Sequence, residues 1–130
     1  MKRKAIFISI ILMVFVCATA TAQSVTVTDI NQNVKLKVDG NTVKDRNNST
    51  IGRIDGNVIK DRNSNVVAKV DGNTIKDRNN STVGQISGNS VTIKNRKVDG
   101  SDVKNGSSVV GKIRGSANRM QLVAILCFLE

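Results

Sequence analysis

The chain has 130 residues, and its 20 Lys and Arg residues against 10 Asp and Glu residues give it a net charge of +10. It contains no His, Trp, Tyr or Pro. These absences exclude a His-based catalytic triad, a histidine metal site and the aromatic platforms on which binders of single-stranded nucleic acid stack bases. We therefore expect no enzyme activity, no catalytic residue, no metal, no cofactor and no nucleic-acid partner.

Residues 1–22 are predicted to be a secretory signal peptide. Lys2, Arg3 and Lys4 precede an apolar run over 5–16, and small residues follow over 18–22. The alternative is a membrane anchor, but the run is shorter than the ~20 residues that a spanning helix needs. Residues 23–130 then form a single domain with no membrane span, secreted or held in the periplasm or at the cell surface. Loss of the three basic residues lowers the net charge from +10 to +7.

Three consecutive 16-residue segments, 38–53, 54–69 and 70–85, repeat nearly the same sequence, and the first and third agree at 13 of 16 positions. A unit this short cannot bury a core alone, so the copies must pack against one another. Related turn sequences follow at 87–89 and 98–100. The sequence therefore contains five turn starts, at positions 39, 55, 71, 87 and 99.

Each unit contains two turn signals. The first is Asp-Gly, at 39–40, 55–56 and 71–72, which predicts a type I′ hairpin turn. The second is Asp-Arg-Asn, beginning at Asp45, Asp61 and Asp77, which predicts a loop. Calcium binding by these aspartates is the alternative, and the adjacent Lys and Arg charges oppose it. Between the turns lie short segments of strand length, rich in Val, Ile and Thr.

Apolar residues recur at three positions of the unit and are the predicted core. The first column is Val38, Ile54, Val70 and Ile86; the second is Val43, Ile59, Ile75 and Val91; the third is Ile51, Val67 and Val83. A fourth column is small: Gly52, Ala68 and Gly84. Glycine inside a strand marks a bulge or a close approach of the backbone, and we expect strands to crowd toward an axis there.

The last segment, 122–129, is continuously apolar. It would invite aggregation as an exposed strand, so we expect it to be buried at the centre of the repeats, with a lipid-inserting tail as the alternative. Cys127, the only cysteine beyond residue 23, is expected to behave as a small buried apolar residue.

These motifs resemble the five-fold β-flower proteins. The resemblance lies in the tandem Asp-Gly-Asn-x-Ile-Lys-Asp-Arg-Asn-Asn-Ser-Thr-x-Gly units, the predicted signal peptide, and the apolar run that follows a Gly-Lys-Ile strand; it covers 34–129. It implies β-hairpins that radiate from a common centre, and no particular activity. We therefore expect an all-β protein, a closed ring of five short β-hairpin repeats with a 16-residue period and a buried apolar C-terminal segment.

Two columns of basic residues are the candidate functional feature. The first is Lys44, Lys60, Lys76 and Lys104; the second is Lys37, Arg53, Lys69, Lys97 and Lys112, interrupted by Gln85. The candidate anion-binding residues are Lys44, Lys60, Lys76, Lys104, Arg53, Lys69 and Lys112. They predict a binding module for anionic glycans, lipid head groups or another envelope component. Lysines that protect exposed sheet edges are one alternative. Another is a structural protein that self-associates, or docks to an envelope protein, through its tail or sheet edges.

Overall fold

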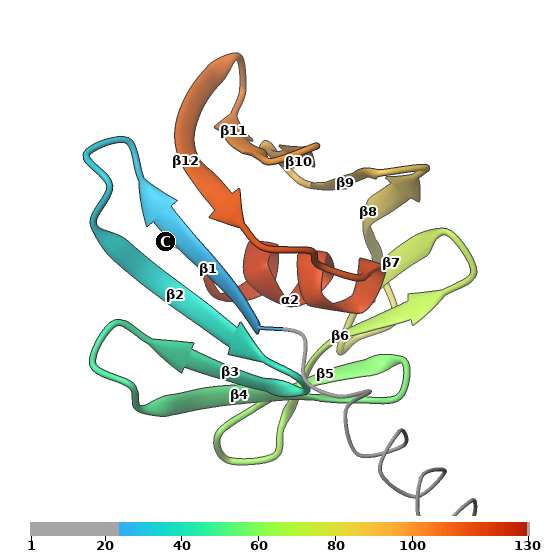
Figure 1. The fold of residues 1–130 in the computed structure, drawn as a ribbon. Coiled ribbons are helices and arrows are strands. Elements are labelled where there is room, and N and C mark those ends of the chain that lie inside the picture. Colours follow the sequence, from blue (N-terminus) through green and yellow to red (C-terminus); the bar gives the residue numbers. More distant parts are fainter. Residues whose placement is uncertain (1–23, 130) are drawn as a thin grey trace, which may run out of the picture.

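The computed structural model describes residues 24–129, so the predicted signal peptide lies outside the described residues. Twelve antiparallel strands form a closed barrel in which every strand pairs with its neighbours in sequence, and the first pairs with the last (Figure 1). The all-β class and the closed ring are confirmed. The strands are β1 Ser24–Asp29, β2 Val34–Asp39, β3 Thr42–Asp45, β4 Thr50–Asp55, β5 Val58–Asp61, β6 Val66–Asp71, β7 Thr74–Asp77, β8 Thr82–Ser87, β9 Ser90–Ile93, β10 Arg96–Asp99, β11 Asp102–Asn105 and β12 Ser108–Arg114.

The tight turns differ from the predicted type. Asp39 pairs with Thr42, so the two loop residues are Gly40 and Asn41 rather than Asp39 and Gly40. Gly40 has φ +64°, and Asn41 is not among the residues with positive φ. A positive φ at the first loop residue alone is typical of a type II′ turn, so the predicted type I′ turn is wrong.

The longer loops are organised by the aspartate that ends each preceding strand. Asp45 Oδ1 accepts hydrogen bonds from the backbone N–H groups of Asn47 (2.9 Å) and Ser49 (3.0 Å). Asp29, Asp61 and Asp77 do the same in their loops. These bonds favour the ionised carboxylate, led by the Asn65 N–H at Asp61 and the Asn33 N–H at Asp29, and they lower the pKa of both groups. Residues 24–129 contain no group of three or more His, Cys, Asp or Glu side chains able to hold a metal ion.

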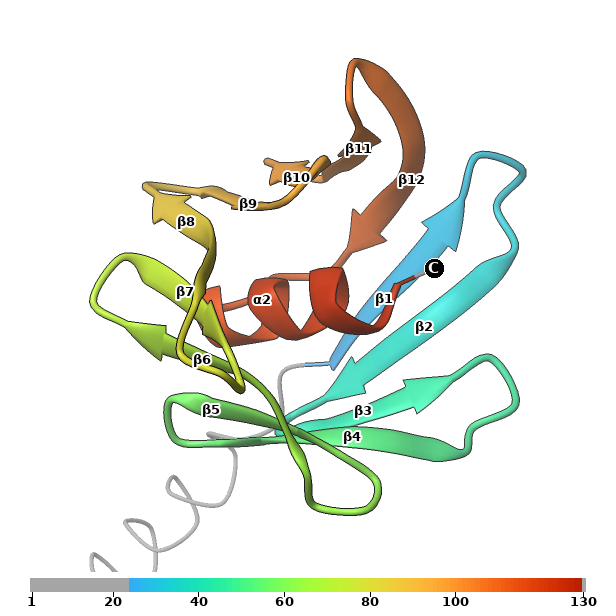
Figure 2. The ribbon, with the colours of Figure 1, turned by 180° about the vertical axis from the view of Figure 1, so that it is seen from behind.

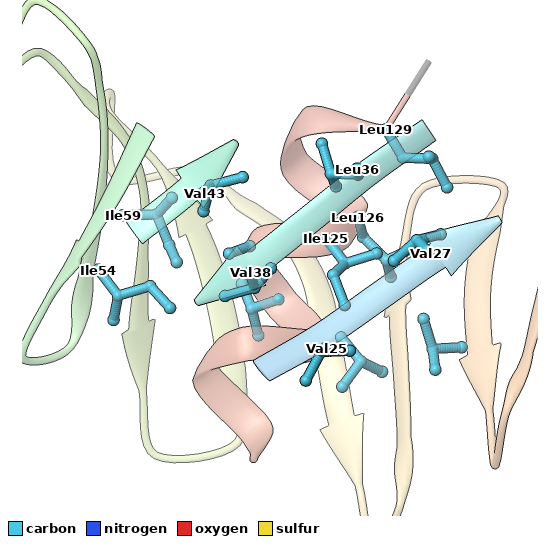
Figure 3. Packing of buried hydrophobic residues seen from close by; sticks show 14 of the residues in the cluster. Val25, Val27, Leu36, Val38, Val43, Ile54, Ile59, Ile125, Leu126 and Leu129 are labelled. Atoms are coloured by element: carbon cyan, nitrogen blue, oxygen red, sulfur yellow. The ribbon is translucent and has the colours of Figure 1, made fainter. Parts of the chain in front are cut away.

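Two of the three predicted apolar columns form the barrel interior. Val38, Ile54 and their equivalents are buried, as are Val43, Ile59 and theirs (Figure 3). The third column is only half-buried, because the strand register shifts beside it: Val43 pairs with Gly52 but Lys44 pairs with Thr50. Ile51 is thus the extra residue of a β-bulge. Val67 and Val83 occupy the same place in β6 and β8.

The apolar tail is helical and lies inside the barrel. Helix α2, Arg119–Phe128, is surrounded by strands in both views (Figures 1 and 2). Val123, Ala124, Ile125 and Leu126 are buried. None of the helices in the part of the chain that the structure describes has the length and apolar character needed to cross a membrane.

The N-terminus of α2 is held by a capping box. The Asn118 side chain accepts from Gln121 N (2.8 Å), and Gln121 Oε1 accepts from Asn118 N (3.0 Å). Gln121 Nε2 also donates to the carbonyl oxygen of Gly40 (3.0 Å). The helix is therefore tied to the turn between β2 and β3 by a polar side chain that is itself buried.

Candidate anion-binding surface

The two predicted basic columns face each other across the strands. The directly opposed partners, which we call the basic pairs, are Lys37–Lys44, Arg53–Lys60, Lys69–Lys76 and Lys97–Lys104. Each pair alternates along its strands with buried apolar residues such as Val38 and Val43. Because successive side chains of a strand point to opposite faces, the basic pairs lie on the outside of the barrel.

One hairpin lacks such a pair. Between β8 and β9 the residues at this position are Gln85 and Thr92. The protein therefore carries a neutral version of the same site within an otherwise similar hairpin.

Carboxylates neutralise only part of this charge. In three of the four basic pairs the aspartate before the turn glycine reaches one cation of the pair: Asp55 lies 3.2 Å from Lys60 Nζ, Asp71 lies 3.5 Å from Lys76 Nζ and Asp99 lies 3.9 Å from Lys97 Nζ. Within residues 24–129, neither Arg53 nor Lys69 has a carboxylate within 4.0 Å. Both are exposed. Each of these pairs thus presents one compensated and one uncompensated cation.

Lys112 stands apart from the other candidates. It lies on β12 opposite Asp102 and Thr28 rather than opposite a cation. Its Nζ is 2.8 Å from Asp102 Oδ1, and this hydrogen bond and charge lower the pKa of the Asp102 carboxyl. The structure thus brings six of the seven candidates into pairs and leaves Lys112 in an ion pair. Lys37 and Lys97, which were not among the candidates, complete two of the pairs. Their place in the second basic column was the sequence signal that could have identified them.

Opposed like charges carry an energetic cost. In a sheet, like charges directly opposite each other are destabilising by a few tenths of a kcal/mol up to about 1 kcal/mol. Protection of a sheet edge, the alternative role for these lysines, has no edge to act on within the closed barrel. Edge protection therefore does not explain the basic pairs.

Cys127 lies at the other end of α2 from Gln121 and is half-buried. Burial disfavours the thiolate and raises the pKa of the Cys127 thiol to about 12. A protonated thiol is a poor nucleophile and a poor metal ligand. The side chain therefore packs as a small apolar group.

Comparison with known proteins identifies the family of this chain. A family model described as 5-fold beta-flower protein matches residues 23–130. No curated protein and no solved structure matches the chain. The matched segment contains every strand of the barrel and the helix inside it, and the chain belongs to the 5-fold beta-flower protein family.

Proposed function

We propose that this protein is a secreted, non-catalytic binding module whose basic pairs hold anionic glycans or lipid head groups. The observation that carries the proposal is the set of like charges placed directly opposite each other on the outside of four hairpins. Such placement lowers stability, which selection for folding alone does not favour. Multiple equivalent sites around a ring suit a repetitive polyanion, because linked weak contacts raise the total affinity.

We further infer that the architectural unit is one two-stranded hairpin with a 16-residue period, repeated five times. β2, β4, β6 and β8 begin at Val34, Thr50, Val66 and Thr82, which supports this period. β10 begins at Arg96 and shortens the last interval. In this scheme β12 and β1 form a sixth pair, which closes the ring.

Retention on immobilised heparin, a polyanion of carboxylates and sulfates, tests the proposal. Binding by exposed cations is screened by salt, with a Debye length of about 10 Å at 0.1 M and 3 Å at 1 M. We expect retention at low salt, elution as salt rises, and earlier elution of the double variant Arg53→Gln/Lys69→Gln. The control is Lys112→Gln, which removes a cation outside the basic pairs. Retention that does not change with ionic strength, or an equal loss of retention in the double variant and in Lys112→Gln, contradicts the proposal.

The proposed location has its own test. Mass spectrometry of the exported protein should give a mature N-terminus at Gln23, since the small residues over 18–22 fit a signal peptidase. A chain that retains residues 1–22 in the cytoplasm contradicts secretion.

The assembly alternative has less support. Its two surfaces were the apolar tail and the sheet edges, whereas α2 is buried and the barrel is closed. The exposed large apolar side chains of residues 24–129 are Ile30, Val109 and Val110, which lie on or beside the paired strands β1 and β12. Light scattering distinguishes the two functions. A stable wild-type oligomer that dissociates in the Ile30→Ser and Val109→Ser variants would favour assembly.

A further inference from the structure

The barrel contains a cavity of about 490 Å³ beside the C-terminal part of α2, which we call the rim cavity. Its position follows from the chain. β9 and β10 are joined by only two residues, Lys94 and Asn95, whereas β3 and β4 are joined by the four residues 46–49. On the side of β4, Phe128 packs against Gly52. Beside the two-residue connection between β9 and β10, the helix residues that line the space are Leu126 and Cys127, which are smaller than Phe128.

The rim cavity is open and has a mixed lining. Its apolar part, which we call the floor, includes Val67, Val83 and Ile93 from three strands and Leu126 from the helix. No aromatic side chain of residues 24–129 lines it, so this part of the chain offers no flat surface there on which a sugar ring would stack. The volume lies in the roughly 300–1,000 Å³ range of small-molecule sites. Floor and volume together suit a flexible alkyl chain.

The polar part of the lining, which we call the mouth, contains two cations. Lys94 and Arg96 line the cavity together with the amides of Asn95 and Asn105. One donor of the Arg96 guanidinium bonds the carbonyl oxygen of Leu129, and a guanidinium carries five N–H donors in all. Among residues 24–129, Asp77 is the one carboxylate in the lining, and its Oδ1 already accepts from Asn79 N (2.9 Å) and Ser81 N (3.0 Å). The mouth is therefore matched to an anion.

We propose that the rim cavity binds a single-chain alkyl carboxylate, with the chain among Val67, Val83, Ile93 and Leu126 and the carboxylate at Lys94 and Arg96. A carboxylate accepts charge-assisted hydrogen bonds from both cations, and the alkyl chain leaves water for an apolar floor. None of the basic pairs lines the cavity, so this site is independent of the proposed function.

Titration of the purified protein with decanoate, kept below its micelle concentration and followed by methyl NMR, tests the site. We expect saturable shifts confined to the methyl groups of Val67, Val83, Ile93 and Leu126. Affinity should rise with each methylene added from hexanoate to decanoate, by at most about fourfold per methylene, the increment for a fully buried CH₂. No saturable shift, or shifts centred on Ile30 and Val109 instead, overturns the proposal.

The charge at the mouth has a separate test. Lys94 has φ +56°, so Lys94→Asn is the suitable variant because Asn tolerates this conformation. Decanoate should bind this variant about two- to fivefold more weakly, the range expected for a partly exposed ion pair, while decanol should bind it as it binds the wild type. Lys112→Gln, outside both the cavity and the basic pairs, should bind decanoate unchanged. Equal loss for decanoate and decanol, or no loss for decanoate, overturns the assignment of the head group.

Filling the cavity completes the test. Ala68 is buried in its lining, and Ala68→Leu should abolish decanoate binding while basic-pair retention on heparin stays intact. If circular dichroism shows that this variant does not fold, Val83→Phe fills the same space from a half-buried bulge position. Unchanged decanoate affinity in the variant that folds overturns the site.

Discussion

Phe128 packs directly on Gly52: a Cβ atom added to Gly52 would clash with Cζ of the Phe128 ring. The same atom would lie 2.9 Å from the backbone carbonyl oxygen of Lys60. The ring is the only aromatic side chain in residues 24–129. The glycine that the sequence repeat placed in β4 is therefore the surface against which the end of α2 rests.

Gly52→Ala should lower the free energy of unfolding by about 1–3 kcal/mol, the usual cost of overpacking a core. Urea denaturation measures it. The double variant Gly52→Ala/Phe128→Leu should recover part of the loss, because the shorter side chain leaves room beside β4. Ala68→Gly, the reverse change at the equivalent position of β6, should cost only about 0.5–1 kcal/mol through chain entropy. Additive losses in the double variant would contradict the contact.

Gln121→Leu should lower the free energy of unfolding by about 1–3 kcal/mol, although leucine is well suited to a buried helix. The reason is that the Gly40 carbonyl and the Asn118 N–H both lose their side-chain partner. Met120→Leu, at the adjacent half-buried position, is the control and should change stability by less than about 1.5 kcal/mol. Chemical denaturation measures the stability of both variants. If Gln121→Leu leaves the stability unchanged, the helix is held by apolar packing alone.

Lys69→Gln should raise stability while it weakens anion binding. It removes one of two opposed cations and leaves the ion pair between Lys76 and Asp71 intact. We expect a gain of about 0.2–1 kcal/mol at low ionic strength, and a smaller gain at 1 M salt. Thermal denaturation at both salt concentrations measures it.

The hairpin of β8 and β9, which lacks a basic pair, allows the opposite change. Gln85→Lys adds a cation opposite Thr92, so it should strengthen retention on heparin with little change in stability. A loss of stability in Lys69→Gln would show that the cross-strand cations do not repel each other.

Acid should weaken the loop that follows β5. The pKa of Asp61 is lower in the folded protein, chiefly through the Asn65 N–H bond. A lowered carboxyl pKa stabilises the fold fully above the unfolded value of about 4, and this contribution is lost as pH falls through the folded pKa. Asp61→Asn should therefore show a smaller loss of stability between about pH 4 and pH 2 than the wild type does. Parallel pH profiles for the two proteins would contradict this.

Cys127 should react slowly with iodoacetamide in the folded protein. The thiolate is the reactive form, and a pKa of about 12 leaves little of it near neutrality. At pH 8 we expect the rate to be about 10²–10³ lower than in the urea-unfolded chain, whose thiol has a pKa near 8.5. Mass spectrometry of timed samples measures both rates, and equal rates would mean that the thiol is in water.

Much of the barrel follows from the sequence because its signals are local. β-branched residues such as Val43 and Ile59 recur at one position of the unit, and each loop aspartate bonds only within its own loop. The turn type was wrong because Asp-Gly and Gly-Asn are both hairpin signals. The register decides between them: a loop at 39–40 would place Asn41 opposite Val38, on the inner face, whereas a loop at 40–41 places Val43 there.

Two other features of the structure were not predicted from the sequence, for related reasons. Ile51, Val67 and Val83 are apolar at a regular interval, and a periodic pattern does not reveal that a bulge turns them partly outward. The opposition of Lys69 and Lys76 also depends on register, so the sequence pattern predicted two columns rather than pairs. The helix had a usable signal, because Asn118 followed by Gln121 fits a capping box before an apolar run.

The pairing of β1 with β12 joins strands that begin at Ser24 and Ser108. Without this pairing β1 has one neighbour, the ring is open and its lining of valine and isoleucine is accessible to water. Closure of the barrel therefore requires a contact between segments far apart in the sequence, and the loop-closure entropy of such a contact makes it a slow step of folding.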